Sequence, residues 1–245
     1  SVEGEEFLPY AREILAQEAA ARAALGQGNI TPTGTLRFAA SSTFAQLYIM
    51  PLLPEFMAQY PGIDLDLRLS DSPFDLIEGS FDLALRASEM VDSSLRGRKI
   101  ADDRRILCAA PGYLAEHGTP TSPDDLRQHK VIAFRSQSAR RLVDAGGRTA
   151  LFEPRQSACR IVMDDGCSQK IATLHGAGIS INSLWSVHRE LIAGDLVEVL
   201  PGYRVDYETA LWLVYPKSNV LTAKVRIFID FLIERIGTPP AWERP

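Results

Sequence analysis

Three consecutive hydroxyl residues, Ser41, Ser42 and Thr43, follow a short apolar run (residues 36–40) and precede a helical stretch. At such a strand-to-helix turn, free backbone N–H groups and the positive end of the helix dipole favour a carboxylate or a phosphate. The alternative is helix N-capping, which accounts for only one of the three hydroxyls. The sequence therefore predicts an anion contact at this turn, with simple capping left open.

A second polar group follows the alternating segment 81–87 (FDLALRA). Arg86 and Ser88 lie where the carboxyl end of this strand is expected, which is where ligands bind in open α/β sheets. Arg86 suits a bidentate anion contact. It suits an ion pair with Asp71 or Asp82 equally well, and both interpretations stay open.

Two further groups flank later elements. Phe134 and Arg135 end the apolar segment 130–135, and an aromatic ring beside a cation suits an aromatic or unsaturated acid. A buried core phenylalanine is an equally good interpretation. Asp164 and Asp165 precede a helical stretch, where carboxylates stabilise a helix start.

The cysteine and histidine content predicts neither a metal site nor a cofactor. Cys108, Cys159 and Cys167 form an odd and sparse set, without the spacing of a disulfide framework or a zinc site. The four histidines are scattered, and the sequence contains no phosphate-binding loop, dinucleotide fingerprint or nucleophile elbow. We therefore expect a reducing, cytoplasmic environment and no enzymatic activity.

The composition is that of an ordinary globular chain. The 245 residues are 46% hydrophobic and 23% charged, with a formal net charge of −5. That balance argues against DNA binding by this stretch itself, because duplex binding depends on cationic contacts to phosphate. No apolar run approaches the about 20 residues that cross a bilayer, and the first residues lack a signal-peptide pattern.

The elements that position these residues begin with a helix over residues 5–25. Its apolar residues, among them Phe7, Ile14 and Leu15, recur at helical spacing and form a narrow stripe. A stripe ahead of the globular body must be buried, and we expect it to pack against a second subunit. Packing on the same chain is the alternative.

From residue 34 onward, strand-like and helical segments alternate, which indicates crossover units and a mostly parallel sheet. Expected strands cover 36–40, 63–69, 81–87, 104–111, 130–135, 158–163, 177–181 and 210–216, with two weaker strands around the turn at Gly146 and Gly147. Expected helices cover 44–60, 74–79, 111–118, 122–129, 167–176, 187–196 and 221–237.

These segments form two α/β sets without a flexible linker between them. The crossings near 107–110 and 207–211 fall inside apolar strands, which predicts two Rossmann-like subdomains joined by hinge strands, with ligands between them. The expected parts are a linker helix (1–30), subdomain I (34–108 and 210–237) and subdomain II (109–209).

Several segments, in the right order, carry a family resemblance: residues 4–25, 34–71, 81–100, 109–129 and 190–203. They are similar to the linker helix and effector-binding domain of LysR-type transcriptional regulators, without the N-terminal DNA-binding domain. The resemblance implies a fold like that of type 2 periplasmic binding proteins. It also implies dimers, often tetramers, and small molecules bound between the subdomains.

The resemblance also bears on the site. It implies effector contact at residues 41–43, with Phe134 and Arg135 facing the same space and the loop 164–166 bordering it. Asn182 and Ser183 follow the strand 177–181, at a place where many relatives carry a proline.

Redox sensing through Cys167 is a weaker possibility. Peroxide-sensing relatives carry a reactive cysteine after a similar acidic-glycine loop, and a helix start lowers a thiol pKa. The relatives' second cysteine, however, corresponds to the region of His175 and Gly176, and neither is a cysteine.

The leading hypothesis is the ligand-sensing part of a cytoplasmic regulator, which contacts operator DNA only through a domain outside this chain. Its expected partners are an effector, a second copy or a tetramer, and RNA polymerase. We expect helix 44–60 of one subunit to meet helix 221–236 of the other. The main alternative is a solute-binding protein of a transport system, which shares the bilobed architecture.

Overall fold

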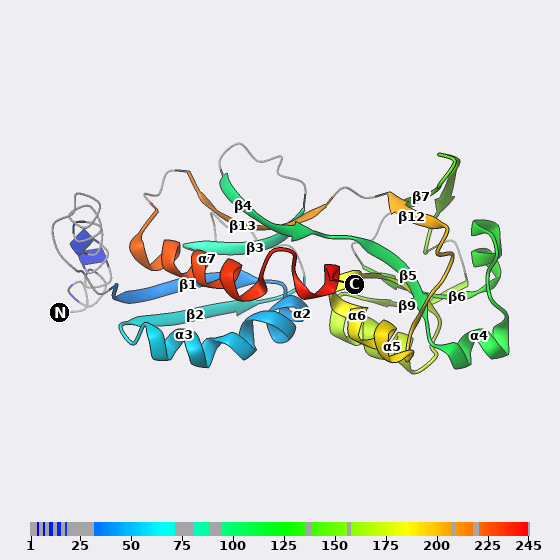
Figure 1. The fold of residues 1–245 in the computed structure, drawn as a ribbon, viewed down its shortest axis with the longest axis horizontal. Coiled ribbons are helices and arrows are strands. Elements are labelled where there is room, and N and C mark those ends of the chain that lie inside the picture. The colour runs from blue at the N-terminus through cyan, green and yellow to red at the C-terminus, as the bar shows by residue number, and fades with distance from the viewer. Residues whose placement is uncertain are drawn as a thin grey trace.

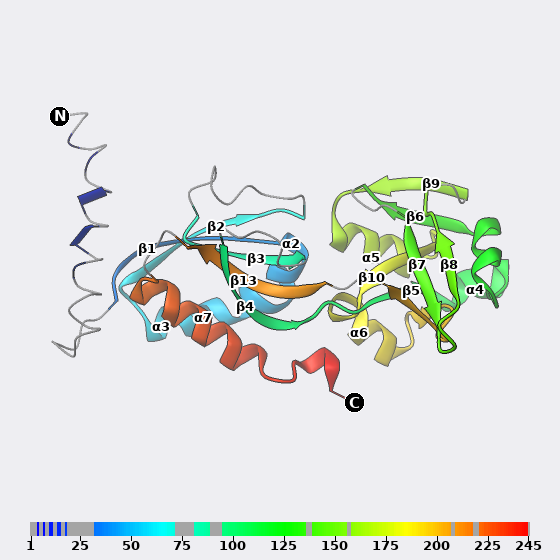
Figure 2. The same cartoon turned by 90° about the horizontal axis from the view of Figure 1, so that it is seen from above.

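The computed structural model contains two α/β lobes that lie side by side and are joined by two chain crossings (Figures 1 and 2). Of the segment 1–31, it describes Gly4, Phe7, Tyr10, Ala11, Ile14, Leu15 and Glu18. The other described residues are 32–71, 81–88, 95–135, 139–155, 158–206, 209–217 and 221–244.

The first lobe is built on a five-stranded sheet of order β2-β1-β3-β13-β4. Its strands are β1 (Gly34–Ala40), β2 (Ile63–Leu69), β3 (Leu83–Ser88), β4 (Leu95–Asp102) and β13 (Ala210–Pro216). Strand β1 pairs in parallel with β2 and β3, whereas β13 runs antiparallel to β3 and β4. The parallel register sets Ala40 beside Leu69, so β1 and β2 end together.

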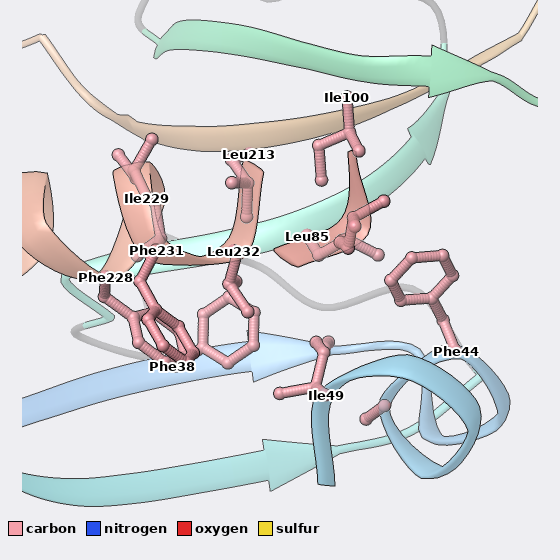
Figure 3. Packing of buried hydrophobic residues seen from close by; sticks show 14 of the residues in the cluster. Phe38, Phe44, Ile49, Leu85, Ile100, Leu213, Phe228, Ile229, Phe231 and Leu232 are labelled. Atoms are coloured by element: carbon pink, nitrogen blue, oxygen red, sulfur yellow. The ribbon is translucent and has the colours of Figure 1, made fainter. Parts of the chain in front are cut away.

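Aromatic side chains from distant segments fill the core of this lobe (Figure 3). Phe228 of α7 (Ala223–Ile236) packs edge-on against Phe38 of β1, with ring centroids 5.2 Å apart. Phe56 of α3 (Leu53–Gln59) packs edge-on against the ring of Phe228, with ring centroids 4.9 Å apart. Burying such side chains stabilises a fold by roughly 1.5–3 kcal/mol each, so this cluster fixes both helices on the sheet.

Part of the same core joins α3 to α7 within one chain. Phe56 and Phe231 lie 5.1 Å apart within one chain, and Arg235 Nε donates to Glu55 Oε1 at 2.8 Å. These faces of the two helices are therefore buried against each other inside the first lobe, and the predicted contact between two subunits stays a prediction.

The predicted helix over 44–60 is a chain of shorter helical pieces. They are α2 (Ser42–Phe44), the π-helical η1 (Ala45–Ile49), the 3-10 helix η2 (Met50–Leu52) and α3. Pro51 and Pro54 lack the N–H groups that a continuous α-helix requires, so the hydrogen-bond pattern changes around them. The predicted helix 74–79 lies outside the described residues.

The second lobe is built on a sheet of order β11-β5-β10-β6-β9, and a three-stranded sheet of order β12-β7-β8 adjoins it. Its strands are β5 (Arg105–Ala109), β6 (Lys130–Phe134), β7 (Arg140–Asp144), β8 (Thr149–Phe152), β9 (Ala158–Met163), β10 (Ile179–Ser183), β11 (Val197–Glu198) and β12 (Tyr203–Asp206). Its helices are α4 (Pro111–His117), the 3-10 helix η3 (Pro123–Gln128), α5 (Gly166–Leu174) and α6 (Leu184–Ala193). A 3-10 turn, η4 (Ala241–Glu243), ends the chain beside α6, between the lobes (Figure 1).

Sheet membership places the first crossing at residues 103–104, where the sequence suggested a boundary after residue 108. Strand β5 pairs with β10 and β11, so it belongs to the second sheet from its first residue. The return crossing precedes β13. Strands β4, β11 and β12 had not been separated from their surroundings in the sequence.

The described positions of the N-terminal segment are helical and stand beside the far end of the first lobe (Figures 1 and 2). Phe7, Tyr10, Ile14 and Leu15 are 61–69% exposed. Among the described residues, no helix combines the length and apolar character needed to span a membrane.

Candidate functional site

The carboxylate of Asp71 collects hydrogen bonds from both lobes at the junction between them. Oδ1 accepts from Ser41 Oγ at 2.6 Å and from the Thr43 backbone N–H at 3.2 Å. Oδ2 accepts from Thr43 Oγ1 at 2.6 Å and from the backbone N–H of Gly166 at 2.7 Å. We call this group the interlobe latch.

The parallel register of the first sheet explains why Asp71 reaches the hydroxyl turn. Strands β1 and β2 end side by side, and Ser70 extends the pairing by donating its N–H to the carbonyl of Ala40 at 3.1 Å. Ser41 and Asp71 therefore follow directly at the same sheet edge. In this structure the carboxylate of Asp71 accepts hydrogen bonds from the turn at which the sequence predicts an anion contact, here called the cradle. Ser41 Oγ also accepts from the Phe44 N–H at 3.3 Å and so caps α2, which supports the capping interpretation.

Gly166, the first residue of α5, brings the second lobe into contact with the cradle. A Cβ at this position would lie 2.8 Å from Thr43 Oγ1 and 3.3 Å from Asp71 Oδ2. Real Cβ atoms essentially never come within 3.0 Å of a neighbour, so any larger residue at position 166 requires the Thr43 side chain or the lobes to shift.

The electrostatics of the interlobe latch favour the charged form of Asp71. Burial raises the pKa of this carboxyl, but the hydrogen bonds from Ser41, Thr43 and Gly166 outweigh burial and hold the pKa below its ordinary value. Within the described residues, no ion pair involves Asp71. Hydroxyl and backbone donors stabilise its charge in place of a cation.

The structure also places the residues predicted at the ends of β3 and β6 and in the loop before α5. Asp165 caps α5 by accepting from the Ser168 N–H at 2.6 Å, which supports the capping interpretation. Asp164 pairs with the exposed Arg135 at 3.4 Å, and Phe134 beside it is half-buried. Arg86 is half-buried on β3.

Ser42 and Ser88 complete that set. Ser42 is the half-buried first residue of α2, between the two residues that donate to Asp71. Ser88 ends β3, where its backbone pairs with Ala210 of β13.

Asn182 and Ser183 lie in the interior of the second lobe. The Asn182 amide donates to Ser180 Oγ at 2.7 Å and to Cys108 Sγ at 3.4 Å. Ser183 is 5% exposed, and its carbonyl accepts from Ser186. Both residues therefore take part in buried packing where the sequence suggested effector contact.

The cysteines are unpaired, and their surroundings differ. Burial raises the pKa of the Cys108 thiol to about 11, which makes it inert at neutral pH. Cys159 and Cys167 are partly exposed, and Cys167 follows Gly166 at the start of α5. Nothing in the described part of the chain groups three or more His, Cys, Asp or Glu side chains as a metal would require.

A second carboxylate, Asp103, lies where the chain crosses between the lobes. Its Oδ2 accepts from Arg105 Nε and Nη2 at 2.9 and 2.7 Å and from Thr209 Oγ1 at 3.2 Å. Its Oδ1 accepts from the Trp185 indole N–H at 2.8 Å. Asp103 N–H also donates to the Thr209 carbonyl at 2.9 Å, which ties the two crossings together. We call this group the hinge cluster.

Aromatic packing beside the hinge cluster joins α6 to the first lobe. Trp185 packs edge-on against Phe44 with centroids 5.1 Å apart, and Tyr48 donates its hydroxyl to the Trp185 carbonyl at 2.5 Å. Trp242 of η4 packs on Tyr48 at 4.6 Å. The two lobes thus share a hydrogen-bonded and aromatic junction, with the interlobe latch and the hinge cluster at different points of it.

Sequence reasoning missed Asp71 as a site residue and considered it only as a partner for Arg86. The signal was present: residues 36–40 and 63–69 were both predicted strands, and parallel pairing would bring the residues after them together. Asp103 carried no such signal, because its partners Arg105, Trp185 and Thr209 come from three separate segments.

Two lobes of this topology, joined by two crossings with polar donors between them, define the class of bilobed small-molecule-binding domains with the periplasmic-binding-protein-like fold. Comparisons with known proteins give the family. The model of the LysR substrate binding domain matches residues 30–237. The HTH-type transcriptional regulator CrgA of Neisseria meningitidis serogroup C (strain 8013) is 32% identical over 238 residues, which cover 96% of this chain and 78% of CrgA.

Solved structures agree. A structure of CrgA from Neisseria meningitidis superposes with a TM-score of 0.76 at 30% identity, over 97% of this chain and 80% of that chain. The full-length structure of AphB, a virulence activator of Vibrio cholerae, gives a TM-score of 0.73 at 27% identity, over 96% and 79%. The chain belongs to the LysR family of transcriptional regulators.

Family membership confirms the predicted resemblance and fold class. These relatives are transcriptional regulators, which supports at family level the expectation that the chain is not an enzyme. Membership of this family also disfavours the alternative hypothesis, that the chain is a solute-binding protein of a transport system.

Proposed function

We propose that this chain is the sensing and pairing part of a cytoplasmic LysR-type regulator, in which a small anionic effector binds between the lobes. Binding there changes how the lobes sit against each other. That change alters promoter binding by DNA-binding domains that lie outside this chain.

The observation that supports this proposal most is the convergence of hydrogen-bond donors from both lobes. Two hydroxyls and one N–H group come from Ser41 and Thr43, and the Gly166 N–H comes from the opposite lobe. Donors with this arrangement suit a planar carboxylate, because each of its two oxygens accepts two hydrogen bonds. A ligand that engages both lobes binds one lobe geometry better than another, which is the requirement for a regulatory response.

The test is thermal unfolding in a set of small organic acids and their uncharged amides. A ligand that binds only the folded chain raises the midpoint with its concentration. We expect at least one acid to raise the midpoint where its amide does not, and Thr43→Val to abolish the effect. Thr149→Val, an exposed threonine of β8, is the matched control and should retain it. An effect that survives Thr43→Val, or that no acid produces, contradicts the proposal.

We further propose that the N-terminal helix pairs two copies of the chain. In the complete regulator, we propose that these dimers form tetramers and that the regulator contacts RNA polymerase. The exposed Phe7, Tyr10, Ile14 and Leu15 support pairing, because apolar side chains at helical spacing are buried in helical dimers. Sedimentation should show a dimer that Ile14→Glu with Leu15→Glu converts to a monomer. Leu151→Glu, equally apolar and 59% exposed on β8, should leave it dimeric. An unchanged dimer after the double substitution contradicts this part.

A further inference from the structure

We infer that Asp71 is an autoinhibitory ligand built into the chain: its carboxylate holds the lobes together and must leave the cradle before an effector carboxylate can enter. The part that concerns the effector rests on the proposed function. The part that concerns the lobes rests on the contacts of Asp71 alone.

The first step is saturation of the cradle. A carboxylate accepts about four hydrogen bonds, and Asp71 accepts four, two at each oxygen. The hydroxyl protons of Ser41 and Thr43 and the N–H groups of Thr43 and Gly166 are all used. A second carboxylate would find no donor and would meet a like charge, so it can bind only by exchange.

The second step is the bridge between lobes. Asp71 and Gly166 are 95 positions apart in the chain and belong to different sheets. Their 2.7 Å bond joins an ionised acceptor to a backbone donor, and such charge-assisted bonds are roughly twice as strong as neutral ones. The lobes also touch here, since the Gly166 site has no room for a Cβ beside Thr43.

The third step is the exchange itself. Replacing Asp71 by a free carboxylate conserves the charge and all four hydrogen bonds, and the released side chain gains water. A neutral ligand would leave the charge of Asp71 in place and would gain no donor. The exchange replaces a tethered acceptor with a free one, so the bridge between Thr43 and Gly166 passes from Asp71 to the effector. Effector binding and departure of Asp71 from the cradle are therefore one event.

The test uses acetate as the probe, on the complete chain, with the unfolding midpoint measured against chloride of equal ionic strength. Asp71→Ala should unfold at a lower temperature than the wild type, and acetate should restore part of the loss. Acetamide should not restore it, and the wild-type midpoint should not respond to acetate. Asp66→Ala, which removes an exposed charge from β2, is the control and should show no acetate response.

A second variant keeps the test decisive where Asp71→Ala does not fold. Asp71→Asn fills the cradle with an uncharged side chain of the same shape, so it should lower the midpoint without rescue by acetate. Equal acetate responses in wild type and Asp71→Ala, or no response in either folded protein, overturn the inference.

The effector part has its own readout. An organic acid that binds the wild type should bind Asp71→Ala about tenfold more tightly or better, because a cradle open one time in ten lowers apparent affinity by that factor. Equal or weaker binding to Asp71→Ala overturns the exchange, even though the effector proposal stands. Acetate rescue without any acid that binds the wild type supports the latch and counts against the proposed effector.

Discussion

Two aspartates join the lobes of this protein, and their surroundings give them different properties. Asp103 in the hinge cluster is 1% exposed and holds a guanidinium, an indole N–H and a hydroxyl. Asp71 in the interlobe latch is half-buried and holds two hydroxyls and two backbone N–H groups. Each accepts four hydrogen bonds, and each draws its donors from segments far apart in the chain.

The difference lies in what remains when the carboxylate is removed. Without Asp103, the partly buried Arg105 and the buried Trp185 indole lose their partner in a place that water reaches poorly. Without Asp71, the donors are hydroxyls and N–H groups that water or another anion can satisfy. The hinge cluster is therefore a fixed structural contact between the lobes, whereas the carboxylate of the interlobe latch can be exchanged for another acceptor.

The largest expected effect follows removal of the hinge carboxylate. Asp103→Ala leaves a cation and an indole N–H without acceptors, and breaking a buried ion pair in this way costs about 3–5 kcal/mol. Urea unfolding measures the loss. Asp102→Ala, whose carboxylate is 73% exposed in its pair with Lys99, should cost at most about 1 kcal/mol. Equal losses of unfolding free energy in Asp103→Ala and Asp102→Ala would mean that the hinge carboxylate stabilises the fold no more than a surface charge does.

An intermediate effect follows steric opening of the latch. Gly166→Ala places a Cβ 2.8 Å from Thr43 Oγ1, and overpacking of this kind costs about 1–3 kcal/mol. Gly112→Ala, with no heavy atom within 4 Å of its Cβ site on α4, should instead stabilise by up to about 1 kcal/mol. Urea unfolding of the two variants measures the contrast. A tolerated Gly166→Ala would mean that the lobes are not held in contact there.

The smallest effect is the pH dependence of the latch. Because the pKa of Asp71 is lowered in the folded chain, its stabilising contribution is present above the ordinary carboxyl pKa of about 4 and is lost as the pH falls through the folded value. The free-energy difference between wild type and Asp71→Asn should therefore be largest near neutrality and shrink on acidification. A difference that stays flat or grows at low pH contradicts the charged latch. Asp66→Asn controls for the loss of one exposed charge.

Much of the fold follows from patterns that the sequence displays locally. The strict alternation of residues 63–69 and the apolar run 210–216 predicted β2 and β13 with their observed bounds. The helix over 44–60 was wrong as one element, because apolar periodicity outweighed Pro51 and Pro54 in the prediction. The helix pairing between subunits stays a prediction, because an apolar face does not say which surface covers it.

The site was predicted in part. The sequence predicted an anion contact at the turn 41–43, with simple capping left open, and a carboxylate-stabilised helix start at Asp164 and Asp165. That a carboxylate of the same chain fills the cradle depends on the register of β1 against β2, which is a tertiary property. The hinge cluster depends on three separate segments meeting at a crossing, and no local sequence pattern predicts that they meet there.

Amide hydrogen exchange at Gly166 tests the central claim most directly, because this N–H donates to Asp71 across the lobes. The account predicts that exchange at Gly166 is at least about tenfold faster in Asp71→Ala than in wild type, equivalent to about 1.4 kcal/mol of lost protection. The Asp103 amide, which donates to Thr209 in the hinge cluster, should exchange equally slowly in both. Unchanged exchange at Gly166 would contradict the latch, and faster exchange at both amides would show that the two junctions are not separate.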